Sequence, residues 1–146
     1  MKPGTPEAGQ HCAECGACQR PLTCRARLEL LLAWEADDPA LRELHFLTVA
    51  SYNLQHPAVF TDEARLGLER AFAGYLEGRL TIARIRRQAA AVNGATRVHR
   101  PPSDVHPVQR SWAITIDCVA VPGHAVEAPE RVRAWAESIH RALTAK

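Results

Sequence analysis

Apolar residues recur at a helical spacing along most of this 146-residue chain. The leucine-rich stretch 25–36 predicts a first helix. The break at 37–39, where an aspartate can cap and a proline can occupy the first turn, predicts a second helix over 39–55. This helix should end at 56–57, because the residue before a proline avoids the α region.

The pattern predicts three more helices. One runs over 61–78, one over 81–94, and the last begins near Pro129. Residues 95–111 carry three prolines and little apolar pattern, so they predict a long connection. The stretch 112–121 is rich in β-branched residues without a clean period, which fits either a buried short helix or a short extended segment.

Composition also favours helix. Hydrophobic residues make up 47% of the chain and aromatic residues only 5%, so alanine and leucine supply most of the apolar side chains. We predict an all-α fold, a small bundle of about five helices, with residues 1–11 as a flexible tail and 12–146 as one zinc-bound domain. The start has no apolar signal core and no run approaches about 18 apolar residues, so we expect a cytoplasmic protein that spans no membrane.

Four of the five cysteines fall within residues 12–24. In a reducing compartment, clustered cysteines favour metal or redox chemistry over structural disulfides. The run Cys12-x-x-Cys15-Gly is typical of a tight turn, a zinc knuckle, that aims two thiolates at one point. Zinc usually takes four such ligands, and Cys24 is a natural third because it lies at a predicted helix start, where the helix dipole favours a thiolate.

The fourth ligand follows from the expected hairpin of the first two helices. Cys24 lies about as far before the turn as His56 lies after it, so the two should face each other. His45 is an alternate on the same helix face, but about 11 residues of helix place it about 16 Å from His56, too far to share an ion. The preferred site is therefore Cys12, Cys15, Cys24 and His56, and the rival replaces His56 with Cys18.

Other chemistry fits the same cysteines less well. A ferredoxin-type iron–sulfur motif has three residues and then Cys-Pro after its third cysteine, whereas here five residues separate Cys18 from Cys24 and Arg25 follows. A Cys-x-x-Cys pair also serves thiol exchange, so a redox dithiol stays an alternative. Zinc is the interpretation that the spacing favours most.

Four segments of the chain are characteristic when taken together: Cys12-Ala-Glu-Cys15-Gly-Ala, Cys24-Arg25, His45-Phe46-Leu47-Thr48-Val49 and Tyr52-Asn53-Leu54-Gln55-His56-Pro57. They are similar to segments of a family of small, uncharacterised bacterial proteins with a domain of unknown function, which open with a CPxCG knuckle and carry a Y-x-L-Q-H-P helix end. Trp112-x-x-Thr115 and the segment 131–136 extend the resemblance over most of residues 12–143. The resemblance implies that the cysteines pair with the histidine segment, and it implies no activity. This chain departs from the family pattern by Ala13 in place of proline and by the extra thiol Cys18.

These observations favour a structural zinc in a binding or regulatory module. The first alternative is a zinc enzyme with an open metal position, in which Tyr52 and His45 transfer protons. The second is a thiol redox sensor with Cys18 as the resolving thiol. We interpret His45 as a core histidine rather than part of a pocket, and Gln55 as bonded either to the site or to a helix end.

The partners expected are a zinc ion and either a protein partner or a second copy of the chain. Residues 79–110 hold seven arginines against one acid, but no interleaved aromatics for base stacking, and the whole chain carries only +2. We read that stretch as a solvated face and do not expect nucleic-acid binding. Five further polar residues in loop-like sequence lack ligand spacing: His99, Asp104, His106, Asp117 and His124.

Overall fold

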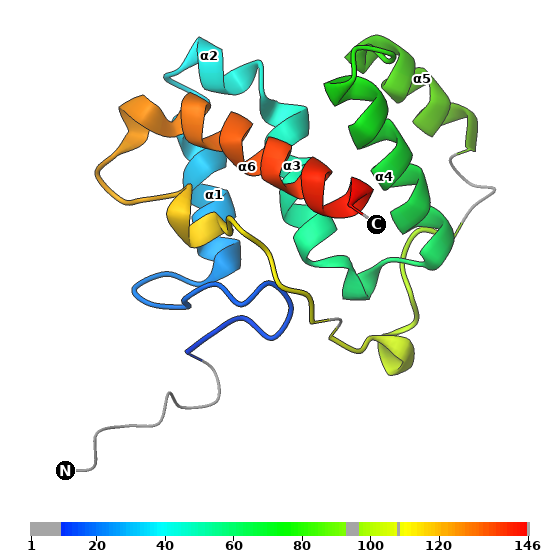
Figure 1. Cartoon of the computed structure of the whole chain (residues 1–146), viewed down its shortest axis with the longest axis horizontal. Coiled ribbons are helices and arrows are strands. Elements are labelled where there is room, and N and C mark those ends of the chain that lie inside the picture. The colour runs from blue at the N-terminus through cyan, green and yellow to red at the C-terminus, as the bar shows by residue number, and fades with distance from the viewer. Residues whose placement is uncertain (1–9, 93–96, 108, 146) are drawn as a thin grey trace.

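A computed structural model describes residues 10–92, 97–107 and 109–145. Within these ranges the chain forms six α-helices and no strand, which confirms the predicted all-α fold (Figure 1). The α-helices are α1 Cys24–Trp34, α2 Pro39–Arg42, α3 His45–Gln55, α4 Asp62–Leu76, α5 Ile82–Val92 and α6 Ala128–Thr144. Four short 3-10 helices lie between them: η1 Pro57–Val59, η2 Pro102–Asp104, η3 Ile116–Cys118 and η4 Ala125–Glu127.

Side-chain caps start the helices where the sequence placed them. The Asp38 carboxylate accepts the first free amides of α2, and the Thr61 hydroxyl accepts from the backbone of Ala64 in α4. The end of α3 directly before His56 and Pro57 is also as predicted. Part of the predicted tail 1–11 and the predicted end of α5 at 93–94 fall outside the described residues.

The predicted second helix is wrong in one respect, because it is two helices. The backbone leaves helical geometry at Leu44, with φ −93° and ψ 12°, between α2 and α3. Leu41 and Leu44 are both buried, at 0% and 7% exposure. The turn lets both side chains enter the core while α3 continues in another direction (Figure 1), so tertiary burial overrides the continuous local propensity.

Helix α6 crosses α3 and also contacts α2 and α4, so it closes the core (Figure 1). One face of this helix is buried, with Val132, Trp135 and Ile139 at 0% exposure. The indole nitrogen of Trp135 donates to the Gln55 side-chain oxygen at 3.1 Å, and the Gln55 amide nitrogen donates to the Ile114 carbonyl at 2.8 Å. Gln55 therefore ties α3 to α6 and to the segment before η3, and both sequence-based interpretations of this residue are wrong.

The ambiguous stretch 112–121 forms turns and the 3-10 helix η3 in the described chain, without a strand. It helps to hold the N-terminal loop in place, directly through Asp117 and indirectly through Arg27 of α1. The Cys18 amide donates to the Asp117 carboxylate at 3.0 Å, and the buried Arg27 guanidinium donates to the Ala120 carbonyl at 2.9 Å and the Arg20 carbonyl at 3.3 Å. The cysteine loop is thus fixed from both sides, by α1 and by η3.

None of the helices among the described residues is long and apolar enough to cross a membrane.

Candidate metal centre

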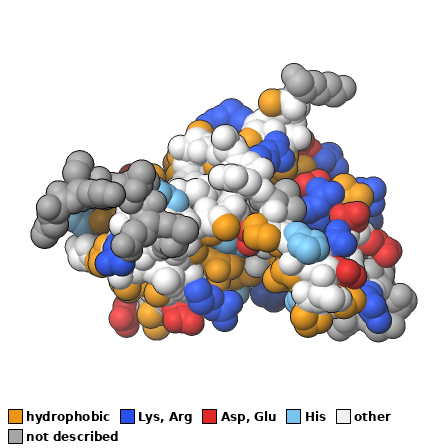
Figure 2. Space-filling model, turned by 90° about the horizontal axis from the view of Figure 1, so that it is seen from below, with side chains coloured by type: hydrophobic (Ala, Val, Ile, Leu, Met, Phe, Trp, Pro, Cys, Tyr) orange, Lys and Arg blue, Asp and Glu red, His pale blue; other side chains and the backbone are white. Residues whose placement is uncertain are grey.

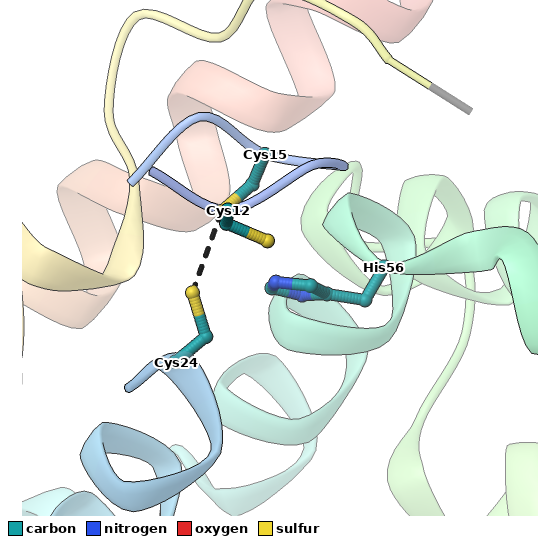
Figure 3. Close-up of side chains that lie close together, drawn as sticks. All are labelled: Cys12, Cys15, Cys24 and His56. Carbon is teal, nitrogen blue, oxygen red and sulfur yellow. Dashed lines mark hydrogen bonds between the residues drawn. The ribbon is translucent and has the colours of Figure 1, made fainter. Parts of the chain in front are cut away.

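Four side chains from three chain segments meet at one end of the helical core (Figure 3). Cys12 and Cys15 come from the N-terminal loop, Cys24 is the first residue of α1, and His56 directly follows α3. Their ligand atoms all lie within 4.8 Å of one another. In the part of the chain that the structure describes, this is the one such group of His, Cys, Asp or Glu side chains.

The loop that carries Cys12 and Cys15 is a tight turn. The Cys12 amide donates to the Ala17 carbonyl at 2.8 Å, and the Gly16 amide donates to the Cys12 carbonyl at 3.0 Å. Gly16 has φ +82°, a conformation that side chains with a Cβ rarely adopt. The turn also directs the Ala17 amide at the Cys15 sulfur, 3.4 Å away, so the backbone helps to stabilise a thiolate there.

Cys24 is positioned by the start of α1. The Thr23 hydroxyl caps this helix, and the Cys24 amide donates to the Gln19 side-chain oxygen at 2.9 Å. The other end of the Gln19 amide donates to the Cys24 sulfur at 3.7 Å. The sulfur therefore lies at the positive end of a helix dipole and receives an N–H donor, two features that favour a thiolate.

His56 presents one ring nitrogen to the cysteines. Its Nδ1 lies 2.7 Å from the Tyr52 carbonyl, to which it donates, and its ring stacks on Tyr52 with centroids 4.2 Å apart. The Nε2 atom is buried and has no hydrogen-bond partner. A buried ring nitrogen is costly when nothing binds it, and a backbone carbonyl on Nδ1 is how metal-bound histidines are usually oriented.

The pKa values of Cys15, Cys24 and His56 are shifted because these side chains lie close together. The Cys15 and Cys24 sulfurs lie 3.6 Å apart, and the hydrogen bond between them lowers the pKa of Cys15 to about 4 and raises the pKa of Cys24. Burial alone would lower the pKa of His56, but the Cys15 thiolate and the Tyr52 carbonyl raise it to about 9. Without a metal, the arrangement favours one thiolate beside an imidazolium.

The donor set fits a metal ion of zinc type. Three sulfurs and one imidazole nitrogen converge from fixed positions, and soft ligands of this kind select zinc or iron–sulfur centres. A family model matches residues 10–144.

The chain belongs to the family of unknown function DUF5946. The match covers nearly the whole chain and confirms that the resemblance seen in the sequence is to a domain-of-unknown-function family. Comparison with curated proteins gave no match, and comparison with solved structures gave none either. What this DUF5946 member does has to be argued from its own geometry.

Two alternates for the site lie elsewhere in this DUF5946 member. The Cys18 sulfur donates to the Arg20 carbonyl at 3.4 Å and is not in the group of four. His45 is half-exposed, and its Nδ1 lies 2.9 Å from the Glu35 carboxylate. The interpretation of His45 as a core histidine is wrong, because the turn at Leu44 directs it outward to Glu35.

Two positioning residues were not found from the sequence. The Glu14 carboxylate accepts from the Ala58 amide at 2.9 Å and so ties the cysteine loop to η1, next to His56. Gln19 contacts both the amide and the sulfur of Cys24. The contact of Gln19 could have been expected from the sequence, because Gln19 lies only five residues before the cysteine that begins α1. Nothing near Glu14 in the sequence indicates a contact with residue 58.

The remaining sequence candidates lie at the surface. Arg84, Arg86 and Arg87 of α5 are exposed, as a solvated face requires. Acidic and basic side chains are interspersed on the face shown in Figure 2. Four of the five loop residues are exposed, and the fifth, Asp117, is used by Cys18 and Thr115; burial would raise its pKa, but these two hydrogen bonds lower it.

One face of the candidate centre opens to solvent. A cavity of about 500 Å³ is bordered by three of the four donors, Cys12, Cys24 and His56. Tyr52 and the loop and helix-start residues complete its lining. Cys15 does not border this cavity, so the four donors differ in how far solvent reaches them.

Proposed function

We propose that this DUF5946 member binds one zinc ion through Cys12, Cys15, Cys24 and His56. The observation that carries the proposal is the convergence of four donor atoms within 4.8 Å, one of which is the buried and unpartnered Nε2 of His56. Zinc would be the missing partner of that nitrogen, and its positive charge would offset the repulsion between the close thiolates of Cys15 and Cys24.

The ion is proposed to be structural. A tetrahedral zinc with four protein donors has no open position, whereas a catalytic zinc keeps one for water or substrate. The donors come from the N-terminal loop, the start of α1 and the end of α3, so one ion would hold three segments together. Such an ion contributes directly to folding stability.

We propose a binding or regulatory role for the module as a whole. The loop that carries Cys12 and Cys15 lies between α1 and η3, and a bound zinc ion would fix its conformation there. The loop would then offer a binding surface, and the metal itself would take no part in a reaction. None of the five cysteines is in a disulfide, and we propose a reducing compartment such as the cytoplasm, where thiolates stay available to a metal.

Metal analysis of the purified protein tests the proposal. The protein is prepared without chelator, and we expect one zinc per chain by elemental analysis. Replacing zinc with cobalt should give the visible absorption of a tetrahedral sulfur-ligated ion. A metal-free protein that takes up neither ion would contradict the proposal. Iron together with acid-labile sulfide would show that the same donors hold an iron–sulfur cluster instead.

A further inference from the structure

We propose that Cys12 is the site at which small, uncharged, soft carbon electrophiles modify this protein, and that this modification releases the metal. The inference rests on the proposed zinc site and adds a reactivity to it. Three observations carry it: how solvent reaches each sulfur, which sulfurs receive N–H donors, and the charge of the donor set.

Access separates Cys12 from the other two thiols. Cys15 and Cys24 are each 4% exposed, whereas Cys12 is only partly buried. Both Cys12 and Cys24 border the open cavity of about 500 Å³, but Cys24 is almost fully buried there and Cys12 is not. We therefore expect a molecule of a few heavy atoms that enters this cavity to reach Cys12 before Cys24.

Hydrogen bonding also distinguishes Cys12 from Cys15 and Cys24. The Cys15 sulfur accepts from the Ala17 amide, and the Cys24 sulfur accepts from Gln19. Among residues 10–92, 97–107 and 109–145, no N–H donates to the sulfur of Cys12. A donated N–H withdraws electron density from a thiolate and lowers its nucleophilicity, so the undonated sulfur is the more reactive one.

Charge selects the class of electrophile. Zinc with three thiolates and one neutral imidazole carries a net charge of −1, so an anionic reagent is repelled and an uncharged one is not. In the reaction, the Cys12 sulfur forms a bond to the electrophilic carbon while the bond from that carbon to its leaving group breaks. The leaving group departs with the electron pair. The resulting thioether is neutral and a weak ligand, so the metal loses a donor.

Iodoacetamide and iodoacetate test the inference as a matched uncharged and anionic pair. The starting protein is zinc-loaded Cys18→Ser/Cys118→Ser, which lacks the two thiols outside the group. We expect iodoacetamide to label Cys12 about tenfold faster than Cys15 or Cys24, as peptide mapping would show. A zinc indicator should report about one zinc released per label. Iodoacetate should react more slowly, relative to its rate with a free thiol.

A second variant tests the hydrogen-bond argument. Gln19→Ala removes the donor to Cys24 and should raise labelling of Cys24 while Cys12 stays the first site. Labelling of Cys15 or Cys24 before Cys12, or an alkylated Cys12 that keeps its zinc, would overturn the inference and leave the zinc site standing. Absence of zinc before any reagent is added would overturn both the zinc site and the release.

Discussion

The Nδ1 atom of His56 lies 2.7 Å from the carbonyl oxygen of Tyr52, one helical turn earlier. Because a carbonyl only accepts, this contact places the proton of the neutral ring on Nδ1. The lone pair of Nε2 is then available to bind a metal beside the cysteines. The end of α3 thus sets both the position of the histidine and the tautomer that a metal requires.

Removal of His56 tests whether it is a ligand. We expect His56→Ala to lose most of the bound zinc and to lower the melting temperature by about 10 °C, because a structural ion contributes several kcal/mol to folding. Elemental analysis and thermal unfolding would measure both effects. His45→Ala, at the start of α3, is the matched control, and it should keep full zinc because His45 lies outside the group of four and contacts Glu35 instead. A folded His56→Ala protein with one zinc per chain would remove His56 from the proposed site.

The metal-free protein should be most stable between about pH 6.5 and pH 9. The lowered pKa of Cys15, about 4, contributes stability that is lost as pH falls from the ordinary thiol range toward 4. The raised pKa of His56, about 9, contributes stability that is present in full below about 6.5 and lost as pH rises through 9, and over this range it offsets the gain from Cys15. The raised pKa of Cys24 contributes stability that is lost as pH rises above the ordinary thiol value of 9.0, so the protein should be less stable at pH 10. Urea unfolding after metal removal at pH 5, 7 and 10 would measure this. Equal stability of the metal-free protein at pH 5 and pH 7 would contradict the pairing.

Arg27 should stabilise the cysteine loop from inside the core. Its side chain is 4% exposed and donates to two backbone carbonyls, so Arg27→Met should cost about 2–3 kcal/mol by leaving both carbonyls unpaired. Arg25→Met, two residues earlier on an exposed side chain, should change stability by less than about 0.5 kcal/mol. Equal effects of the two substitutions in denaturant unfolding would show that the burial of Arg27 has no energetic role.

Two glycines of α4 should respond to alanine in opposite directions. A Cβ at Gly74 would lie 2.5 Å from Leu80 Cδ1, so Gly74→Ala should destabilise by about 1–2 kcal/mol as Leu80 is displaced. Gly67 has no atom near its Cβ position, so Gly67→Ala should stabilise by about 0.5–1 kcal/mol through helix propensity. Thermal unfolding of both variants would measure the difference, and a shared sign would contradict the packing of Leu80 on α4.

Much of the fold follows from local sequence. The caps at Asp38 and Thr61 and the stop before Pro57 mark helix boundaries because they satisfy or remove backbone donors within a few residues. The meeting of Cys24 and His56 was also predicted, but from a continuous helix over 39–55 that the structure divides at Leu44. The helix boundaries depend on contacts close in sequence, whereas the position of His56 also depends on the direction that α3 takes after Leu44.

The supports of the candidate site were not predictable in this way. Asp117 reaches Cys18 across 99 residues, Arg27 reaches Ala120 across 93, and Glu14 reaches Ala58 across 44. None of these polar residues differs in its local pattern from a surface residue. Their partners are set by how α3 and η3 pack against α1, and a periodicity argument does not contain that information.

The sequence by itself determined the helical class, most helix boundaries and the set of residues proposed to bind zinc, because local propensity and helix geometry decide these. The tertiary structure alone decided the split at Leu44, the outward position of His45 and the burial of Gln55 against Trp135. It also decided that Cys12 is the least buried of the three cysteines in the group of four and borders the open cavity. Burial and long-range hydrogen bonding depend on which segments pack together, and only the folded chain defines that packing.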